Sequence, residues 1–376
     1  MADKKKEKKI KEKKKQPSQS EEEIENEALF EQTNFKKPSN VLKELNKTVY
    51  CNQKAKKQLI NFFNNHINKH AIQKSLFIGG PANTGKAKLV EEFSHIQNIP
   101  FVYIDLASKN PQTSFDEYIA GQIQLQTALE YEINEKDNSI KINKYKDNID
   151  FSALYFDISS LIKPTKNENK KYENETYQEI LAEFPIIPLE VVAGICTKHM
   201  LKIYSFTSPL LEKEIEKRLT GKGTVGFKPT KSFPQANTFS KEKVYSLASY
   251  EDLKKAHFSA ALVNSVSNII TLNYFNEEKF LKIFELENSY LNTSKNYLEE
   301  ETKLKITICD TAKEELAKRL VTNASNAGGI EQAIDTIFED LHFVDKRKKQ
   351  IVIDKEYVQK AFENNYSDQF KKRKEY

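Results

Sequence analysis

The stretch Gly80-Pro-Ala-Asn-Thr-Gly85-Lys86-Ala87 decides the fold of this 376-residue chain. It has the spacing of a phosphate loop, Gly, four residues and Gly-Lys, but it ends in Ala where the motif has Ser or Thr. Such a loop joins a buried strand to a helix and holds phosphate through backbone N–H groups. The hydroxyl that Ala87 lacks is the one that normally ligates Mg²⁺. The stretch therefore predicts a nucleotide-binding α/β fold that lacks one catalytic part.

Hydrophobic periodicity extends this prediction along the chain. Short apolar runs predict strands over Leu76–Ile78, Phe101–Leu106, Ala153–Ile158, Met200–Phe206 and Ile269–Leu272. Helical spacing predicts helices starting at Asn40 and over Gln53–Asn68, Lys86–Ile96 and Leu211–Leu219, with loops over 134–149, 163–175 and 221–230. Strands that alternate with helices indicate a parallel sheet flanked by helices.

The pattern becomes mostly helical from Asn276 onward. Helices are predicted over Glu277–Leu286, Asn288–Lys303, Thr311–Thr322, Gly328–Asp340 and Lys355–Phe362, with a short strand over Gln350–Ile353. The expected organisation is a tail over 1–38, a large α/β domain over 39–274, a small helical domain over 275–366 and a basic C-terminal tail over 367–376.

Charge is concentrated at the N-terminus. Residues 1–15 carry nine Lys against Asp3, Glu7 and Glu12, and the tail turns acidic over Glu21–Glu27. The tail has the composition of a disordered segment. It serves either to keep the protein in solution or to attach it to an acidic surface such as nucleic acid, an acidic protein or an anionic membrane.

Other features of the composition exclude several classes of protein. No run of eighteen apolar residues predicts a transmembrane helix. Three widely spaced cysteines form neither a metal-type pair nor a disulfide framework, which favours a reducing compartment. The chain has only four arginines, Arg218, Arg319, Arg347 and Arg373, so a site that depends on arginine has few candidates.

Several segments, taken in order, resemble a ClpX-type AAA+ unfoldase from about Val41 to Asp354. The phosphate loop is joined by matches at Val49–Lys57, Asn65-His66, Ile99–Phe101, Asp105, Leu211–Leu219, Thr271–Asn273, Ala327–Ile330 and Val352–Asp354. The resemblance implies an AAA+ P-loop domain followed by a small, mostly helical AAA+ C-terminal domain. The family's zinc-binding N-terminal module, with its two Cys pairs, is replaced by the Lys-rich tail, so no zinc is expected.

The resemblance also implies where ATP or ADP would bind. The loop amides and Lys86 would hold phosphates, and Asp157 takes the Walker B position at the end of a buried strand. Nucleotide-binding positions are expected at Val49, Tyr50, Gly80, Pro81, Ala82, Asn83, Thr84, Gly85, Lys86, Ala87, Lys88 and Asp157. Mg²⁺ is expected to bind weakly or not at all, and an empty loop that only supports the fold remains an alternative.

Four positions have lost the chemistry that ATP hydrolysis needs. Ala87 removes the Mg²⁺ hydroxyl, and Ile158 replaces the acid that polarises the attacking water, which no apolar residue can do. Ser265 stands at the arginine-finger position and Gly328 at the sensor-2 position. Because an arginine finger alone accelerates related reactions by about 10³–10⁵-fold, the expected protein is a pseudo-ATPase with a structural or regulatory role. The alternatives are an active, divergent unfoldase subunit of a Clp-type protease, and an acidic-surface binder in which the tail dominates.

The resemblance further implies protein partners, namely AAA+ ring neighbours, a Clp-type protease or a larger assembly. Val225, Gly226 and Phe227 stand where the family docks its protease, with a turn around a buried Phe as the alternative. Tyr118 and Ile119 stand where it has a pore-loop pair, with an ordinary buried helix position as the alternative. Relatives in eukaryotes work in mitochondria or plastids, so a mitochondrial matrix location is expected, or a cytoplasmic one because no presequence is readable.

Overall fold

The computed structural model describes residues 35–372, except 51–52, 69–74, 111, 134–139, 160–190, 193–194, 198, 221–240, 257, 259, 323–328 and 344–348. The predicted docking tripeptide Val225–Phe227, the sensor-2 position Gly328, the loops over 163–175 and 221–230 and nearly all of the N-terminal tail lie outside the described residues. Every element below belongs to residues 36–376.

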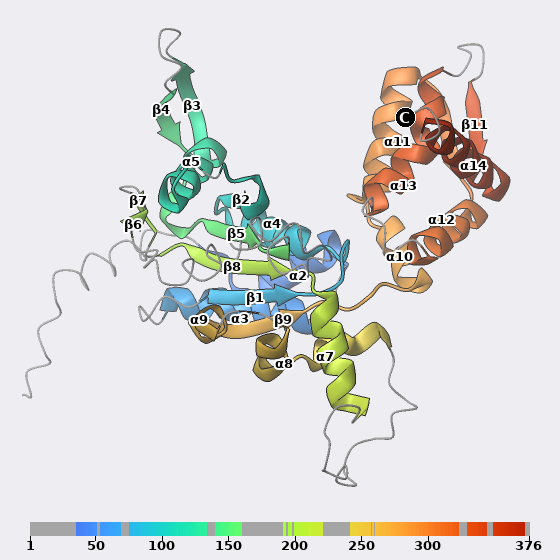
Figure 1. Cartoon of the computed structure of the whole chain (residues 1–376). Helices are drawn as coiled ribbons and strands as arrows, with labels where there is room; N and C mark the ends of the chain where they lie inside the picture. Colours follow the sequence, from blue (N-terminus) through green and yellow to red (C-terminus); the bar gives the residue numbers. More distant parts are fainter. Residues whose placement is uncertain are drawn as a thin grey trace, which may run out of the picture. The chain divides into compact units, whose positions relative to one another are not determined.

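A sheet of five parallel strands forms the centre of the fold, in the order β2-β5-β8-β1-β9 (Figure 1). Every residue of β1 and β8 is buried, as expected for strands covered on both faces. The predicted α/β fold with a parallel sheet is confirmed, and each strand overlaps its expected range. The strands are β1 (Ser75–Gly79), β2 (Phe101–Asp105), β5 (Ala153–Asp157), β8 (Leu201–Phe206) and β9 (Val266–Thr271).

The strand order determines which strand ends lie beside the phosphate loop. Strand β8 lies between β1 and β5, and the register places Gly79 beside Phe206 and Asp157 beside Ser205. Counted within the sheet alone, the order is 2-3-4-1-5. It differs from the 3-2-1-4-5-6 order of dinucleotide-binding folds and from the 2-1-3-4-5 order of flavodoxin-like folds. The residues that follow β1, β5 and β8 therefore meet at one edge of the sheet.

Helices pack against this sheet. Helices α2 (Pro38–Thr48), α3 (Gln53–Asn68) and α4 (Lys86–Gln97) contact one another, while α3 reaches β9 and α4 reaches β2 and β5. A second set shares the main hydrophobic core with the strands. It comprises α5 (Phe115–Thr127), α7 (Pro209–Thr220), the 3-10 helix η6 (Lys241–Leu247), α8 (Tyr250–Lys255) and α9 (Ala260–Ser265).

The prediction of a loop over 134–149 is wrong for part of its length. Strand β4 (Ile140–Tyr145) pairs antiparallel with β3 (Ala128–Ile133), and a short 3-10 helix, η2 (Ile149–Phe151), follows. Charged residues suggested a loop, yet opposite charges lie across the ladder, with Glu132 paired to Lys141 and Glu130 to Lys144. Such cross-strand pairs stabilise a hairpin whose composition alone indicates a loop. Two smaller elements are the β6 (Val191–Val192) and β7 (Ile195–Cys196) pair and the 3-10 helix η1 (Leu106–Ser108).

The C-terminal residues form mostly helices with a hydrophobic cluster of their own. An unexpected strand, β10, pairs in parallel with β11. The elements are α10 (Glu277–Phe284), α11 (Tyr290–Thr302), β10 (Lys305–Ile308), α12 (Asp310–Thr322), α13 (Gly329–Phe338), the 3-10 helix η7 (Glu339–Phe343), β11 (Gln350–Ile353) and α14 (Lys355–Lys372). Among the described residues, no helix is both long enough and apolar enough to cross a bilayer.

Candidate functional site

The phosphate loop connects β1 to α4, as its sequence predicts. Gly85 caps α4 with φ of 77°, a left-handed conformation that glycine adopts without strain. Asn83 is also left-handed, with φ of 59°, and Asn tolerates this region better than most residues with a side chain. Thr84 donates a hydrogen bond to the carbonyl of Pro81 over 2.9 Å and tightens the turn. The loop is therefore a tight turn in which two residues adopt left-handed conformations.

Lys86 is buried within this loop and bonds to the protein itself. Its ammonium group donates to the carbonyls of Pro81 at 2.7 Å and Gly80 at 3.2 Å, and to Thr207 Oγ1 at 2.9 Å. Burial lowers the pKa of Lys86 to about 8, although the nearby Asp157 carboxylate acts in the opposite direction. An incoming phosphate would have to replace some of these three acceptors.

Asp157 ends β5 in the expected place, but its two oxygens are already engaged. Oδ2 accepts a hydrogen bond from the Tyr103 hydroxyl at 3.1 Å, and Oδ1 accepts one from the Ser159 N–H at 2.9 Å. Tyr103 comes from β2, the neighbouring strand, and stacks on Tyr155 with ring centroids 5.6 Å apart. Burial, and then the Asp157 charge, raises the pKa of Tyr103, so the phenol stays protonated as a donor.

The side chains present do not fit the Mg²⁺ site that the family resemblance implies. Ala87 has no oxygen to offer, and both Asp157 oxygens accept hydrogen bonds from the protein. No group of three or more His, Cys, Asp or Glu side chains is arranged to hold a metal ion in the part of the chain that the structure describes. Because Mg²⁺ requires several oxygen ligands in near-octahedral geometry, this loop offers it no direct protein ligand set.

Ile158, which the resemblance places at the position of a catalytic acid, is fully buried. Its side chain belongs to the main hydrophobic cluster, and its N–H donates to the Ser205 carbonyl at 2.9 Å. This position holds the sheet together. A hydrocarbon side chain directed into the core has no means of polarising a water molecule.

Ser265 is the other position within the described residues where the resemblance implies a lost catalytic group. It is the last residue of α9, directly before β9, and its hydroxyl donates to the Leu262 carbonyl at 2.8 Å. The two arginines within the described residues are committed elsewhere. Arg319 pairs with Glu315 at 2.9 Å and lies over the Phe362 ring, and Arg218 belongs to the cluster described next.

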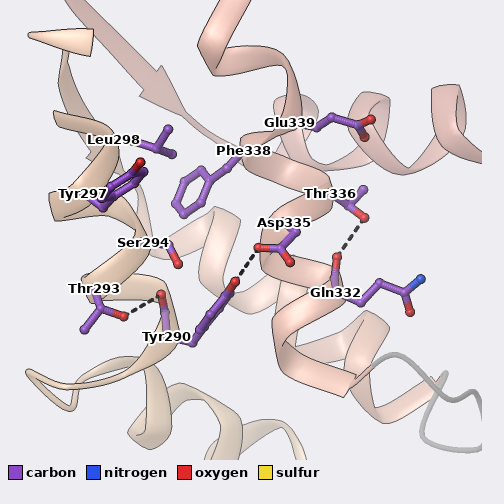
Figure 2. Close-up of a pocket in the computed structure, with 10 residues that line it drawn as sticks. All are labelled: Tyr290, Thr293, Ser294, Tyr297, Leu298, Gln332, Asp335, Thr336, Phe338 and Glu339. Carbon is purple, nitrogen blue, oxygen red and sulfur yellow. Dashed lines mark hydrogen bonds between the residues drawn. The ribbon is translucent and has the colours of Figure 1, made fainter. Parts of the chain in front are cut away.

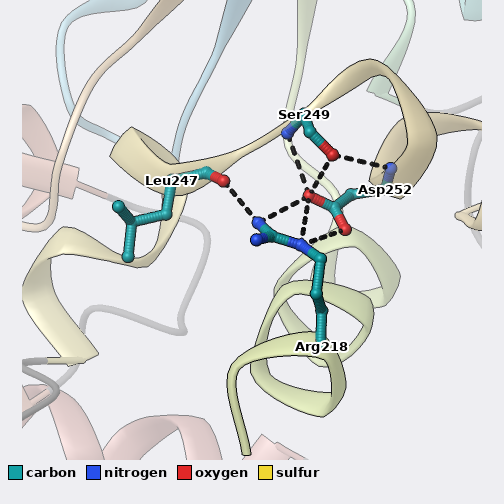
Figure 3. Close-up of polar contacts among 4 residues, drawn as sticks. All are labelled: Arg218, Leu247, Ser249 and Asp252. Carbon is teal, nitrogen blue, oxygen red and sulfur yellow. Dashed lines mark hydrogen bonds and ion pairs between the residues drawn. The ribbon is translucent and has the colours of Figure 1, made fainter. Parts of the chain in front are cut away.

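Arg218 binds Asp252 in a compact polar cluster that ties α7 to α8 (Figure 3). Its Nε donates to Asp252 Oδ1 at 2.9 Å, its Nη2 donates to Oδ2 at 2.9 Å, and Nη2 also reaches the Leu247 carbonyl. Asp252 is fully buried and also accepts from the N–H and hydroxyl of Ser249, forming a capping box. Arg218 therefore supports the fold and is not free to act on a nucleotide.

Thr207 is a residue of this site that the sequence reasoning missed. It directly follows β8, and its hydroxyl accepts from Lys86 and donates to the Gly80 carbonyl at 3.1 Å. Its N–H donates to Ser159 Oγ at 3.1 Å, which links the Lys86 and Asp157 sides of the site. A hydroxyl at a strand end is a signal in the sequence, but only the strand order shows that β8 lies beside β1.

The other expected nucleotide positions differ in burial and in contacts. Lys88 is exposed and forms ion pairs with Glu91 at 3.1 Å and Glu92 at 2.9 Å along α4. Val49 is buried after α2, and its carbonyl accepts from the buried Lys56 ammonium. Tyr50, which follows it, is half-buried. Pro81 is buried, whereas Ala82 and Asn83 are exposed at the tip of the loop.

Tyr118 and Ile119 lie in α5. Ile119 is fully buried in the main core, and the Tyr118 hydroxyl donates to the Asp105 carbonyl at 2.7 Å. These contacts correspond to the alternative in which the pair serves packing.

A search against known protein families finds none that matches this chain.

Proposed function

We propose that this protein is a ClpX-like AAA+ pseudo-ATPase, a P-loop domain followed by a small helical AAA+ domain. It acts as a structural or regulatory subunit of a protein assembly and has lost ATP hydrolysis. The expected partners are AAA+ ring neighbours, a Clp-type protease or a larger complex, and a mitochondrial matrix location follows from the family resemblance.

The observation that carries this proposal is that residue 158 is a buried isoleucine. Hydrolysis requires an acid beside Asp157 that faces the attacking water. Here Ile158 is fully buried, with its N–H bound across to β8. Ala87 supports the same interpretation from the other side of the site, since it offers no metal ligand. Turnover therefore lacks its water-polarising group and its metal ligand together.

Nucleotide binding is a separate part of the proposal. Gly85 gives the N-terminus of α4 no side-chain cap, and the first N–H groups of a helix have no partner within the helix, so such a terminus attracts anions. Lys86 lies at the same place, with a positive charge that a phosphate would stabilise. We therefore propose that the loop holds ATP or ADP without a directly bound metal, and that the occupied loop stabilises the subunit.

The test is a phosphate-release assay on the purified full-length protein, together with calorimetric titration of ATP with and without Mg²⁺. Turnover well below about 1 s⁻¹, with nucleotide binding that does not depend on Mg²⁺, supports the proposal. Turnover at or above that rate identifies an active enzyme and overturns it. Absence of all binding removes the nucleotide part and leaves the structural role.

Purification from the native source tests the assembly part. Chains that co-purify with the full-length protein should remain bound after residues 1–38 are deleted, because the proposed contacts belong to the folded part. Loss of every partner on this deletion would instead show that the basic tail makes the attachment.

A further inference from the structure

A groove of about 840 Å³ lies between α11 and the segment formed by α13 and η7 (Figure 2). Leu298 and Phe338 form its apolar floor and are 3% and 4% exposed, so packing within the protein already covers these two side chains. Tyr290 and Tyr297 stand on the α11 wall and are 37% and 64% exposed. The apolar surface that the groove offers to a ligand therefore consists mainly of tyrosine rings.

The polar groups of the groove differ in what they already bind. The Thr293 and Thr336 hydroxyls donate to carbonyls of their own helices. The Tyr290 hydroxyl donates to Asp335 Oδ1 at 2.8 Å and joins the two walls (Figure 2). Asp335 Oδ2 and the Tyr297 hydroxyl have no hydrogen-bond partner among the described residues. A ligand therefore meets a charged acceptor on one wall and a donor on the other.

The construction of the groove distinguishes among the ways in which proteins bind peptides. An added β-strand needs an open sheet edge, but both walls of this groove are helical. A bound amphipathic helix inserts large apolar side chains into pockets, but the floor side chains here are already covered. A polyproline II segment packs on aromatic rings, and its carbonyls have no partners within the segment and accept hydrogen bonds from a donor. The groove supplies both the rings and a donor.

The spacing of the tyrosines fits a polyproline II segment. Tyr290 and Tyr297 stand seven positions apart on α11, which is about 10.5 Å along the helix axis. A polyproline II helix has three residues per turn and rises about 3.1 Å per residue. Two prolines separated by two other residues therefore lie on one face of the segment, about 9.3 Å apart. One proline can pack on each ring.

The charge of the groove favours a basic ligand. No Lys or Arg is among the described residues that line it. Tyr290 holds Asp335 by one oxygen, so the other oxygen is presented at a fixed place. A carboxylate held in this way forms a charge-assisted hydrogen bond with an arginine of the ligand. The exposed Tyr290 ring beside it adds attraction for the same cation through its face.

We propose that the groove between α11 and α13 binds a proline-rich segment of a partner protein in the polyproline II conformation. Two prolines of the segment pack on the Tyr290 and Tyr297 rings, and the Tyr297 hydroxyl donates to a carbonyl of the segment. An arginine that flanks these prolines binds Asp335. Binding at this groove does not require that the phosphate loop hold a nucleotide.

Fluorescence anisotropy of a labelled peptide, Pro-Leu-Ala-Pro-Ala-Arg, titrated with the full-length protein, tests the proposal. A peptide with alanine in place of both prolines should bind at least about fivefold more weakly, because it loses both contacts with the aromatic anchors. Glutamine in place of the arginine should weaken binding by about two- to fivefold and remove most of its dependence on salt. Absence of binding at about 0.5 mM protein, or equal binding of the alanine peptide, would overturn the proposal.

Matched variants of the full-length protein locate the binding site. Tyr297→Ala should weaken binding of the proline peptide by at least about fivefold. Tyr131→Ala removes a comparably exposed tyrosine, 58% exposed on β3, and should leave binding unchanged. Equal effects of these two variants would refute the site, and circular dichroism verifies that each variant is folded.

A charge variant tests the contact with arginine. Asp335→Asn keeps an acceptor for the Tyr290 hydroxyl but removes the negative charge. It should weaken binding of the arginine peptide by about two- to fivefold and change binding of the glutamine peptide little. An equal loss with both peptides would show that Asp335 does not bind the arginine and would refute this part of the proposal.

Discussion

Replacing Arg218 by Ala gives the sharpest test of how the α/β part is held together. The substitution removes the Nε and Nη2 bonds to Asp252 and the Nη2 bond to the Leu247 carbonyl. It leaves a carboxylate with no solvent exposure and, within the part of the chain that the structure describes, only Ser249 as a hydrogen-bond partner. Removing one partner of a buried pair costs about 3–5 kcal/mol. Because the Arg218 side chain is 36% exposed, we expect the lower end, about 3 kcal/mol.

Urea and thermal denaturation followed by circular dichroism measure this loss. A cost of about 3 kcal/mol should lower the melting temperature by about 6–12 °C for a domain of this size. Lys217→Ala is the matched control, because Lys217 is the neighbouring residue on α7 and pairs with Glu214 on the surface. It should cost less than about 1 kcal/mol. Equal losses in the two variants would refute the reasoning that Arg218 compensates a buried charge.

The pKa of Asp252 determines how stabilisation by the Arg218–Asp252 pair depends on pH. Burial raises the pKa of this carboxyl, but hydrogen bonds from Arg218 and Ser249 outweigh burial and hold the pKa below its usual value. A lowered pKa in the folded state means that the pair stabilises the protein above the unfolded pKa of about 3.9. The contribution of the pair to stability disappears as the pH falls through the lower pKa that Asp252 has in the folded state. The difference in stability between the wild type and Asp252→Asn should therefore be full at pH 6 and shrink below about pH 4.

Three further predictions concern the site and the partners. Tyr103→Phe removes the hydrogen bond to Asp157 Oδ2 and should lower the free energy of unfolding by about 1 kcal/mol, which urea denaturation measures; an unchanged free energy of unfolding would contradict the role of Tyr103. Because the pKa of Lys86 is about 8, its positive charge is lost as the pH rises through that value, and nucleotide affinity should decline between pH 7 and 9. The Lys86→Met variant should bind nucleotide weakly at both pH values. Phe227→Ala should abolish any association with a Clp-type protease in a pull-down experiment, whereas retained association would remove Val225–Phe227 as a docking segment.

Local signals in the sequence predicted most of the central fold. The five strands were found because parallel strands buried on both faces have continuous apolar runs. Helix α3 was predicted at its observed bounds, Gln53–Asn68, because its apolar residues recur at helical spacing. Helix α5 was not assigned, although Ser114 and Glu117 form a capping box that marks its start.

The strands that were missed depend on pairing between segments. Strand β4 is too charged to be identified alone and becomes evident only opposite β3, where Glu132 meets Lys141. Strand β10 is four residues long and has β11, more than forty residues later, as its partner. A short strand is stabilised mainly by the strand it pairs with, so its own residues alone do not predict it.

The sequence by itself determined that the spacing of a phosphate loop is present, that Ala87 has no hydroxyl and that Ile158 has no carboxylate, because these are properties of residue type at a given position. Only the tertiary structure decided that Thr207 binds Lys86 across 121 residues of sequence and that Tyr103 binds Asp157 across 54. The physical reason is the strand order. Because β8 lies between β1 and β5, the sheet brings together side chains that are far apart in the sequence. Their contact cannot be predicted from their distance along the chain.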